Sequence, residues 1–307
     1  MSLAEIELRL RRSNVSAAQI THAGRTILEA GDVARPIDIH SIRKSIMSTL
    51  VGQAYDRGDL DLDTTLGELG IDDGPGLTDR EKSATIHDLL AARSGVHLPV
   101  DDGGRLGRPA RGSHPPGSFW CYSNWDFNVL GNIYERITGR SVFVAFDHDL
   151  ADPLGMSDWD VYRHGSYRYR ADILGGTIRY PNYKFHLSAR DLGKLGRLYL
   201  DNGVCNGRRL LSPEWIARST SPLSRTNQPA GLVGTYGYCW WIAGPSEELS
   251  RAGIVDGTFS AIGFGGNFVT VLPDLDAAVT VLADSGATPL TNDEYSALIA
   301  DLATVLS

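Results

Sequence analysis

The sequence predicts an α+β fold, in which one antiparallel sheet is flanked by helices and an all-helical lobe is inserted. Residues 17–31 alternate polar and apolar side chains around a glycine, the middle of the chain is rich in helical periodicity, and strand patterns return from about Tyr236. Strands near both ends with helices between them indicate a sheet assembled from both termini. We therefore expect a single domain over residues 1–307. Its α/β lobe would span about 1–60 and 195–307, and its helical lobe about 61–194.

The composition is that of a globular protein that forms a core. Of the 307 residues, 42% are hydrophobic and 21% are charged. The net charge of −8 argues against nucleic-acid or anionic-membrane partners, which an acidic surface does not attract. No segment approaches the roughly 18 apolar residues of a membrane helix.

The N-terminal stretch and the cysteines bear on the cellular compartment. Residues 1–19 have the pattern of a charged amphipathic helix and lack the apolar core of a signal peptide, so we expect a cytoplasmic protein. Cys121, Cys205 and Cys239 are odd in number, far apart and without metal-ligand spacing. We expect buried free thiols, no metal and no organic cofactor.

The elements of the first half follow from periodicity and end signals. The first helix precedes the predicted hairpin of residues 17–31. Apolar residues fall at helical spacing from Ile42 to Tyr55, and Gly58 ends that helix. Residues 78–81, TDRE, form a capping box, and the helix in residues 88–96 is predicted to end at Gly95.

The second half begins with a loop and ends with strands. Residues 101–119 are rich in Gly, Pro and Arg, which predicts a long loop of functional importance. Helical periodicity returns in residues 125–139 and 188–203. Strands are predicted in residues 236–244, 259–273 and 276–284, and a helix in 293–306 closes the chain.

The first pattern that carries chemistry is Ser41 followed three residues later by Lys44, one of four lysines in the chain. Residues three apart on a helix lie on one face, so the hydroxyl and the amine can approach each other. A lysine whose pKa is lowered by burial or by nearby cations can take the serine proton. A single S-x-x-K is a weak signal, and the simpler interpretation is a capping serine followed by a solvated cation.

The second pattern is Tyr122 and Asn124, spaced Y-x-N after the loop and before a helix. Beside a lysine ammonium, a phenol is easier to ionise and can shuttle a proton. Asn124 can orient the lysine or hold a substrate amide or carbonyl. Alternatively, the pair is a core tyrosine and a helix-capping asparagine.

The third pattern is GFGGNFVTVLP in residues 263–273. Glycines at the start of a strand let a ligand or another chain approach the backbone closely. An edge strand at this place can donate a backbone N–H to an oxyanion. The alternative is a plain strand with a turn.

Taken in order, the three patterns resemble those of the serine β-lactamase and penicillin-binding-protein superfamily. The resemblance is to its class C-like branch, which includes family VIII carboxylesterases and hydrolases of 6-aminohexanoate dimer. It extends over almost the whole chain through TIHDLLAARSGV, the PPG before Tyr122, DPLGMSDWD, HLSARDLGKLGRLYLDNG and YGYCWWI. The resemblance implies a β-lactamase/transpeptidase-like fold with the site between an α/β lobe and a helical lobe.

The resemblance also implies a role for each matching residue. Ser41 would be the acylated nucleophile and Lys44 its base or proton acceptor. Tyr122 would be the acid–base residue that protonates the leaving group and activates the incoming nucleophile, and either Lys44 or Tyr122 would remove the first proton. Asn124 would join the hydrogen-bond network. The backbone N–H groups of Ser41 and Asn267 would form the oxyanion hole.

One departure from the family pattern concerns the substrate. The family usually has Lys or His at the start of the third motif, where this chain has Phe264, followed by Gly265 and Gly266. We expect a substrate without a carboxylate at that point, or an arginine that supplies the charge from elsewhere. Arg105, Arg108 and Arg111 are the arginines considered, and the simpler interpretation is a solvated surface cluster.

The sequence thus predicts a serine hydrolase that cleaves a small ester or amide through an acyl-Ser41 intermediate. There is no G-x-S-x-G elbow, no H-E-x-x-H helix and no phosphate-binding G-x-x-x-x-G-K. Trp120, Trp125, Trp240 and Trp241 are predicted to line an apolar acyl pocket or to pack in the core. Two alternatives are an acyltransferase that uses the same acyl-enzyme and a catalytically silent binding protein. The oligomeric state is not predicted.

Overall fold

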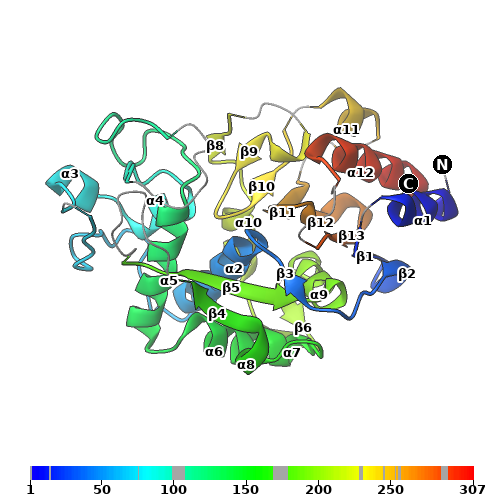
Figure 1. Cartoon of the computed structure of the whole chain (residues 1–307), viewed down its shortest axis with the longest axis horizontal. Coiled ribbons are helices and arrows are strands. Elements are labelled where there is room, and N and C mark those ends of the chain that lie inside the picture. Colours follow the sequence, from blue (N-terminus) through cyan, green and yellow to red (C-terminus); the bar gives the residue numbers. More distant parts are fainter. Residues whose placement is uncertain are drawn as a thin grey trace.

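The main sheet runs through the centre of the computed structural model, which describes residues 2–13, 15–74, 76–98, 108–168, 179–227, 231–244, 246–252, 254, 257–284 and 290–307 (Figure 1). Within these residues the sheet has eight strands in the order β2-β1-β13-β12-β11-β10-β9-β8, and every pairing is antiparallel. Its strands are β1 (Ala17–His22), β2 (Arg25–Gly31), β8 (Ser224–Arg225), β9 (Thr235–Tyr236), β10 (Trp241–Ile242), β11 (Phe259–Gly263), β12 (Asn267–Leu272) and β13 (Ala277–Leu282).

The N-terminal hairpin and the C-terminal strands join directly, as predicted. Strand β1 pairs with β13 from Ala17 opposite Leu282 to His22 opposite Ala277. These strands consist mainly of Ala, Val, Ile, Thr and Leu, and β12 and β13 are buried along their whole length. The sheet therefore closes only when segments more than 250 residues apart meet, which fixes both ends of the chain in one lobe.

Helices cover both faces of the main sheet (Figure 1). On one face, α1 (Leu3–Arg12) and α12 (Asn292–Leu306) pack with β1, β2, β12 and β13 around a core that includes Ile6, Leu10 and Tyr295. Both helices begin with a capping box, at Ser2 and Thr291, which satisfies their first backbone N–H groups. Helix α9 (Ala189–Leu200) packs against β1, β12 and β13.

Helix α2 (Ile42–Asp56) lies in the centre of the molecule and is buried on all sides from Ile42 to Ala54. It contacts β11 and β12 of the main sheet as well as α5 (Asn124–Thr138) and α6 (Val142–Phe146). A helix buried all round needs partners for its polar side chains. Ser45 donates to the Cys239 carbonyl at 2.7 Å, and Gln53 donates to the Leu210 carbonyl at 3.0 Å.

The middle of the chain is not all-helical, which corrects the prediction of an all-helical lobe. Strands β4 (Gly165–Arg168) and β5 (Asn182–Leu187) belong to it, and they form a three-stranded sheet with β3 (Ile37–Asp38) in the order β3-β5-β4. Residues 182–187 alternate intermediate and buried positions, the period of a half-buried strand. These strands were not predicted because each is short and β5 pairs on its other side with β3, far earlier in the chain.

The remaining elements of the described chain are short. They are α3 (Asp79–Lys82), α4 (Ile86–Leu90), a π-helical turn (Asp147–Ala151), α7 (Asp152–Leu154), α8 (Val161–His164), α10 (Pro213–Ser219), α11 (Glu247–Arg251), two 3₁₀ turns (Gly231–Val233 and Pro273–Leu275) and the hairpin of β6 (Val204–Cys205) and β7 (Arg208–Arg209). The predicted capping box before α3 is present, with Thr78 accepting from the backbone of Glu81.

Two predicted elements end differently in the structure. Helix α4 stops at Leu90 rather than at Gly95, because the Leu90 carbonyl accepts from the Cys239 N–H at 3.0 Å and the Ala92 carbonyl from the Cys121 N–H at 2.8 Å. Residues 236–244 do not form one strand. They turn between β9 and β10, where the Gly237 N–H donates to the Trp240 carbonyl at 2.9 Å. At the end of α4, hydrogen bonds from distant segments replace the regular ones, whereas residues 236–244 are interrupted by a local turn.

The hairpin of β11 and β12 packs closely against the residues that precede α2. A Cβ atom at Gly263 would clash with the carbonyl oxygen of Ile39. We expect Gly263→Ala to lower the free energy of unfolding by about 2 kcal/mol, because backbone has to shift to make room. Thermal and urea unfolding measure this change.

Gly67→Ala is the matched control. A Cβ atom at Gly67 meets its nearest neighbour at an ordinary 3.4 Å, so we expect a change within about 0.5 kcal/mol. Equal stability of Gly263→Ala and the wild type would contradict the close approach between Gly263 and Ile39.

Candidate active site

Ser41 stands at the first turn of α2, but its side chain does not cap the helix. Its backbone is helical, with φ −77° and ψ −7°, and the hydroxyl makes no capping hydrogen bond. Instead, Ser41 Oγ lies 2.8 Å from Lys44 Nζ. The interpretation of Ser41 as a capping serine is therefore wrong. The α-helical geometry brings the hydroxyl and the amine together across one turn.

Lys44 connects Ser41 to Tyr122 in one chain of hydrogen bonds. Lys44 Nζ lies 2.6 Å from the Tyr122 hydroxyl, and it sits over the rings of Tyr122 and Phe127 at 4.1 Å and 4.7 Å from their centroids. Lys44 is 2% exposed, whereas Ser41 and Tyr122 are partly exposed. The buried amine thus contacts two residues that are themselves partly exposed.

Burial decides which of these groups carries a charge. Burial, reinforced by the neighbouring Arg43 guanidinium, lowers the pKa of the Lys44 amine well below its ordinary value. Burial also raises the pKa of the Tyr122 phenol, and the hydrogen bond to Ser41 and the charge of Arg43 offset this only in part. The expectation that the phenol is easier to ionise is therefore wrong. The pair favours a neutral amine and a protonated phenol.

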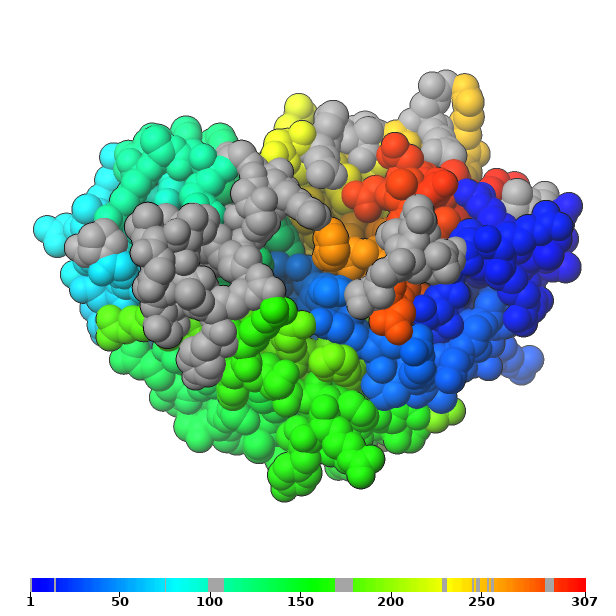
Figure 2. Space-filling model, viewed as in Figure 1, coloured from blue at the N-terminus to red at the C-terminus, as the bar shows by residue number. Residues whose placement is uncertain are grey.

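The third motif forms the turn between β11 and β12. Gly265 and Gly266 have φ angles of +84° and +82°, which L side chains rarely adopt, so this turn requires glycine. The close approach of Gly263 to Ile39 brings the turn beside the segment that leads into Ser41. Figure 2 shows orange atoms of the β11–β12 region meeting blue atoms of the N-terminal third near the middle of this face.

The side chain of Asn267 stabilises that turn through hydrogen bonds. It is fully buried; Nδ2 donates to the Phe264 carbonyl at 2.8 Å, and Oδ1 accepts from the Ala283 N–H at 3.1 Å. Both polar atoms of the Asn267 side chain therefore bond to other parts of the protein.

Within the described part of the chain, the backbone N–H of Ser41 makes no hydrogen bond.

Phe264 is exposed at the turn and contacts a residue that the sequence analysis missed. Its side chain is 64% exposed, and its ring meets that of His40 edge to face at 5.8 Å. His40 has a φ of +49°, a conformation that is unfavourable for residues other than glycine and that recurs at functional sites. Burial lowers the pKa of His40. Its position directly before Ser41 was the only signal in the sequence.

Asn124 is the first residue of α5 and is partly exposed. Ser123 caps this helix, because its hydroxyl accepts from the Trp125 N–H at 3.2 Å. The interpretation of Asn124 as the helix cap is therefore wrong. The interpretation of Tyr122 as an ordinary core residue is also wrong, since its hydroxyl is bonded to Lys44 and its side chain is partly exposed.

The four tryptophans divide between the site and the core. Trp241 stacks on Tyr122 with ring centroids 5.4 Å apart, and Trp120 lies 5.9 Å from Trp241 and 6.4 Å from Tyr122. Trp125 and Trp240 are 2% and 0% exposed and belong to the core. Trp120 and Trp241 therefore form an aromatic cluster with Tyr122, and their lining of an acyl pocket stays a prediction.

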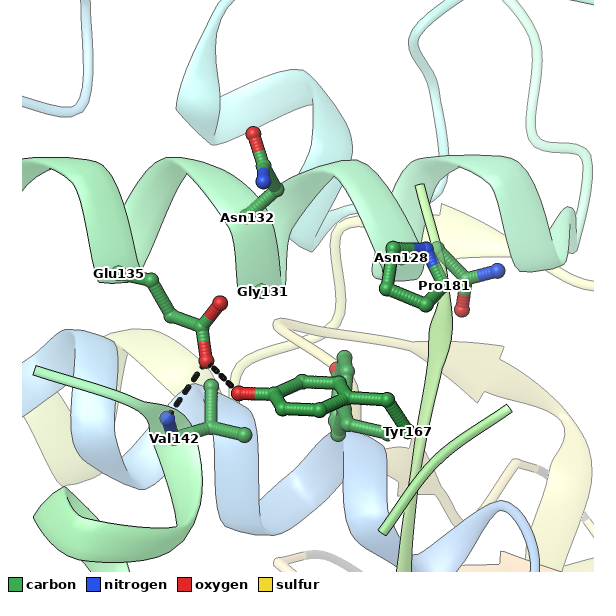
Figure 3. Close-up of a pocket in the computed structure, with 8 residues that line it drawn as sticks. Asn128, Gly131, Asn132, Glu135, Val142, Tyr167 and Pro181 are labelled. Carbon is green, nitrogen blue, oxygen red and sulfur yellow. Dashed lines mark hydrogen bonds between the residues drawn. The ribbon is translucent and has the colours of Figure 1, made fainter. Parts of the chain in front are cut away.

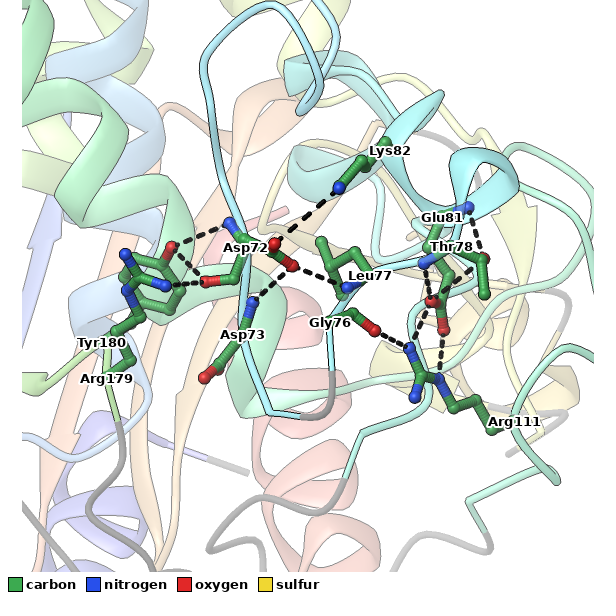
Figure 4. Close-up of polar contacts among 10 residues, drawn as sticks. All are labelled: Asp72, Asp73, Gly76, Leu77, Thr78, Glu81, Lys82, Arg111, Arg179 and Tyr180. Carbon is green, nitrogen blue, oxygen red and sulfur yellow. Dashed lines mark hydrogen bonds and ion pairs between the residues drawn. The ribbon is translucent and has the colours of Figure 1, made fainter.

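The arginines of the loop do not form a free cationic cluster. Arg111 forms two hydrogen bonds with the nearly buried Glu81, at 2.8 Å and 2.7 Å, and Figure 4 shows this pair beside the network around Asp72. Arg108 has bonding partners of its own, and Arg105 lies outside the described residues. Arg111 is therefore neither part of a solvated surface cluster nor a free cation that could replace the missing Lys or His of the third motif, because it is bonded to Glu81.

One small pocket of the structure lies away from this constellation. Residues of α5, among them Asn128 and Glu135, line it together with Tyr167, Pro181 and Tyr183 (Figure 3). None of the predicted site residues lines it. Glu135 accepts there from the Val142 N–H at 2.8 Å and from the Tyr167 hydroxyl.

Three observations concern metal sites, membrane helices and cysteines. Among the described residues, no group of three or more His, Cys, Asp or Glu side chains is arranged to hold a metal ion. In the same part of the chain, no helix combines the length and the apolar character that crossing a bilayer requires. The three cysteines are free thiols, but only Cys239 is fully buried, so the prediction of buried thiols is confirmed for that residue alone.

Known proteins show the same fold and related sequences. The 6-aminohexanoate-dimer hydrolase of Paenarthrobacter ureafaciens is 27% identical over 92% of this chain and 75% of its own length. Esterase EstB of Burkholderia gladioli is 34% identical over 38% of this chain and 36% of its own length. The octameric penicillin-binding protein homologue from Pyrococcus abyssi superimposes with a TM-score of 0.72 at 19% identity, over 100% of this chain and 78% of that one.

The family model described as Beta-lactamase matches residues 14–304, which is nearly the whole chain. The matched region contains the serine, lysine and tyrosine of the hydrogen-bonded chain and the turn between β11 and β12. The predicted β-lactamase/transpeptidase-like fold is thereby confirmed. This chain belongs to the beta-lactamase family.

Proposed function

We propose that this protein is a serine hydrolase that cleaves a small ester or amide through an acyl-Ser41 intermediate. The observation that carries the proposal is the hydrogen-bonded chain from Ser41 through the buried Lys44 amine to Tyr122. A serine hydroxyl becomes a nucleophile when a neighbouring base takes its proton. The relatives named as a 6-aminohexanoate-dimer hydrolase and as an esterase support amides and esters as the substrate class.

In the acylation step, the neutral Lys44 amine accepts the Ser41 proton while Oγ forms a bond to the substrate carbonyl carbon. The carbonyl oxygen becomes an oxyanion, which the backbone N–H groups of Ser41 and Asn267 stabilise. The absence of a hydrogen bond on the Ser41 N–H among the described residues supports this role. The oxyanion then re-forms the carbonyl, and the bond from the carbonyl carbon to the leaving oxygen or nitrogen breaks. The protonated Tyr122 phenol gives its proton to that leaving atom and regains one from the Lys44 ammonium.

In the deacylation step, water attacks the acyl-Ser41 carbonyl carbon. Lys44 and Tyr122 together accept the proton of the water, and Oγ regains a proton as the acid product leaves. The 2.6 Å contact between Lys44 Nζ and the Tyr122 hydroxyl allows a proton to pass directly between the two groups. Asn124 is proposed to hold the polar part of the substrate at this side.

The walls of the site favour an uncharged substrate. Phe264 stands where the family usually has a cation, and it offers an apolar ring beside the weakly basic His40. Trp120 and Trp241 provide aromatic surface near Tyr122. We therefore propose a neutral ester or amide with an apolar or aromatic group, bound without a carboxylate at the β11–β12 turn.

The nucleophile is tested by intact mass measured after incubation with a fluorophosphonate or an activated ester. We expect one adduct on the wild-type protein and none on Ser41→Ala. Ser48→Ala is the matched control, because Ser48 is a fully buried serine of the same helix whose hydroxyl has no hydrogen-bond partner. An adduct that persists on Ser41→Ala would refute the proposal, and absence of any adduct would favour the binding-protein alternative.

The lowered pKa of Lys44 predicts how the thermal stability of the protein depends on pH. Between the lowered pKa of Lys44 in the folded protein and about pH 10, the unfolded chain binds a proton at Lys44 that the folded protein gives up. In that range the residue opposes folding, and the wild type gains stability as the pH rises. We expect Lys44→Met to unfold at higher temperature than the wild type at pH 7 and to lose that advantage as the pH approaches 10. Thermal unfolding between pH 6 and pH 10 measures the difference.

Lys82→Met is the control for this measurement. Lys82 is partly exposed and makes only a 3.7 Å ion pair with Asp72, so its replacement should change stability by less than about 1 kcal/mol. If Lys44→Met were less stable than the wild type by the same amount at every pH, a neutral buried lysine would be ruled out.

The apolar side chain of Phe264 predicts that the enzyme prefers substrates without a carboxylate. We expect Phe264→Lys to raise the preference for a carboxylate-bearing ester over its neutral analogue by about tenfold, since a charge-assisted hydrogen bond contributes about 1.5 kcal/mol or more. The ratio of kcat/KM values for the two esters measures this. Tyr162→Lys adds the same charge at a residue that is 94% exposed in α8 and should leave the ratio unchanged. An unchanged ratio in Phe264→Lys would remove Phe264 from the substrate site.

A further inference from the structure

Arg43 is a buried arginine directly before Lys44 on α2, and the reaction proposed above does not use it. Its side chain is 3% exposed. Nη2 donates to Asn128 Oδ1 at 3.1 Å, and the guanidinium carbon lies 4.3 Å from the centroid of the Tyr183 ring. Nη1 is buried and has no hydrogen-bond partner. Helix α2, helix α5 and strand β5 therefore enclose this side chain together.

The burial of Arg43 is unusual because no carboxylate balances it. Among the described residues Arg43 makes no ion pair, and its Nη2 donates to the neutral amide of Asn128. Buried arginines are normally paired, because removing a guanidinium from water costs several kcal/mol. A buried cation with an unsatisfied nitrogen lowers the free energy of unfolding. A functional role would explain why the chain has an arginine at this position.

Burial disfavours the charged form of the other ionisable groups around Lys44 and Arg43. Burial raises the pKa of the Cys239 thiol, in the turn before β10, to about 12. Burial likewise raises the pKa values of Tyr183 on β5 and of Tyr236 on β9 above their ordinary values. In α5, Asp126 accepts from Ser94 at 2.7 Å, and burial raises its pKa as well. Tyr122 is a protonated phenol, as described above. Arg43 is therefore the permanent charge in this region.

We propose that Arg43 is a positioning residue that keeps the Lys44 amine neutral, and so ready to accept the Ser41 proton. The inference deepens the proposed function and rests on it for the meaning of a neutral Lys44. A guanidinium stays protonated at every pH at which the protein is folded, so its field does not change with conditions. A unit charge within about 10 Å, at an effective dielectric constant of about 20, moves a pKa by about one pH unit.

The test measures the titration of Lys44 itself. The chain has only four lysines, so ¹³C labelling at the lysine ε-carbon gives four resonances, and Lys44→Met identifies the one of interest. We expect Arg43→Met to raise the pKa of Lys44 by one pH unit or more, and Arg43→Lys to retain the wild-type value because it keeps the charge. The rate of adduct formation on Ser41 against pH should show its acidic limb moving upward in the same variant.

Asn128→Asp separates the charge of Arg43 from its packing. This change places a carboxylate where the amide oxygen lies 3.1 Å from the guanidinium, so it neutralises the pair while Arg43 stays in place. We expect the pKa of Lys44 to rise as in Arg43→Met. Asn132→Asp adds the same charge one turn further along α5, on a partly exposed residue, and should have the smaller effect.

An unchanged Lys44 titration in Asn128→Asp would overturn the proposal, whether or not Arg43→Met folds. A purely structural role for Arg43 predicts that result, because Asn128→Asp gives the arginine a better partner. The titration needs no substrate. If Ser41→Ala proved fully active, the proposed hydrolase mechanism would fail while the effect of Arg43 on Lys44 could still be read from the resonance.

Discussion

The burial of the Lys44 amine between Ser41 and Tyr122 is the constraint on which the rest of the site depends. Burial lowers the pKa of this amine well below its ordinary value, because water cannot solvate its charged form. Holding it there requires α2 to be enclosed on all sides, by the main sheet and by α5 and α6. The main sheet, α5 and α6 therefore enclose the helix that carries Lys44. Their contact with one helix sets the protonation state on which the proposed chemistry relies.

This arrangement works against stability. The chain buries an amine and a guanidinium as neighbours, leaves Arg43 Nη1 and the Ser48 hydroxyl without partners, and holds His40 in a left-handed conformation. Each feature has an unfavourable free energy on its own. They cluster around the first turns of α2, whereas the cores on both faces of the main sheet are well packed and apolar. Such a concentration of unfavourable features is typical of a functional site rather than of a scaffold.

The turn between β11 and β12 is the segment proposed to select the substrate. This turn is held by the buried Asn267 side chain and by the approach of Gly263 to Ile39, so Phe264 is presented from a rigid support. Rigid support matters because a side chain on a loose loop would discriminate poorly between substrates. With Trp120 and Trp241 beside Tyr122, the surroundings of Ser41 are aromatic on two sides. This is the physical basis for proposing a neutral substrate.

The sequence by itself determined the elements with strong local signals: the terminal helices, the hairpin of β1 and β2, helix α2, and the spacing of Ser41 and Lys44 on one helix face. Tertiary structure decided the rest, because burial and long-range hydrogen bonds leave no local pattern. It ended α4 at Leu90 and added β4 and β5 to the middle of the chain. It also placed Tyr122 against Lys44 across 78 residues, and the burial of Tyr122 reversed the expected ease of ionising its phenol.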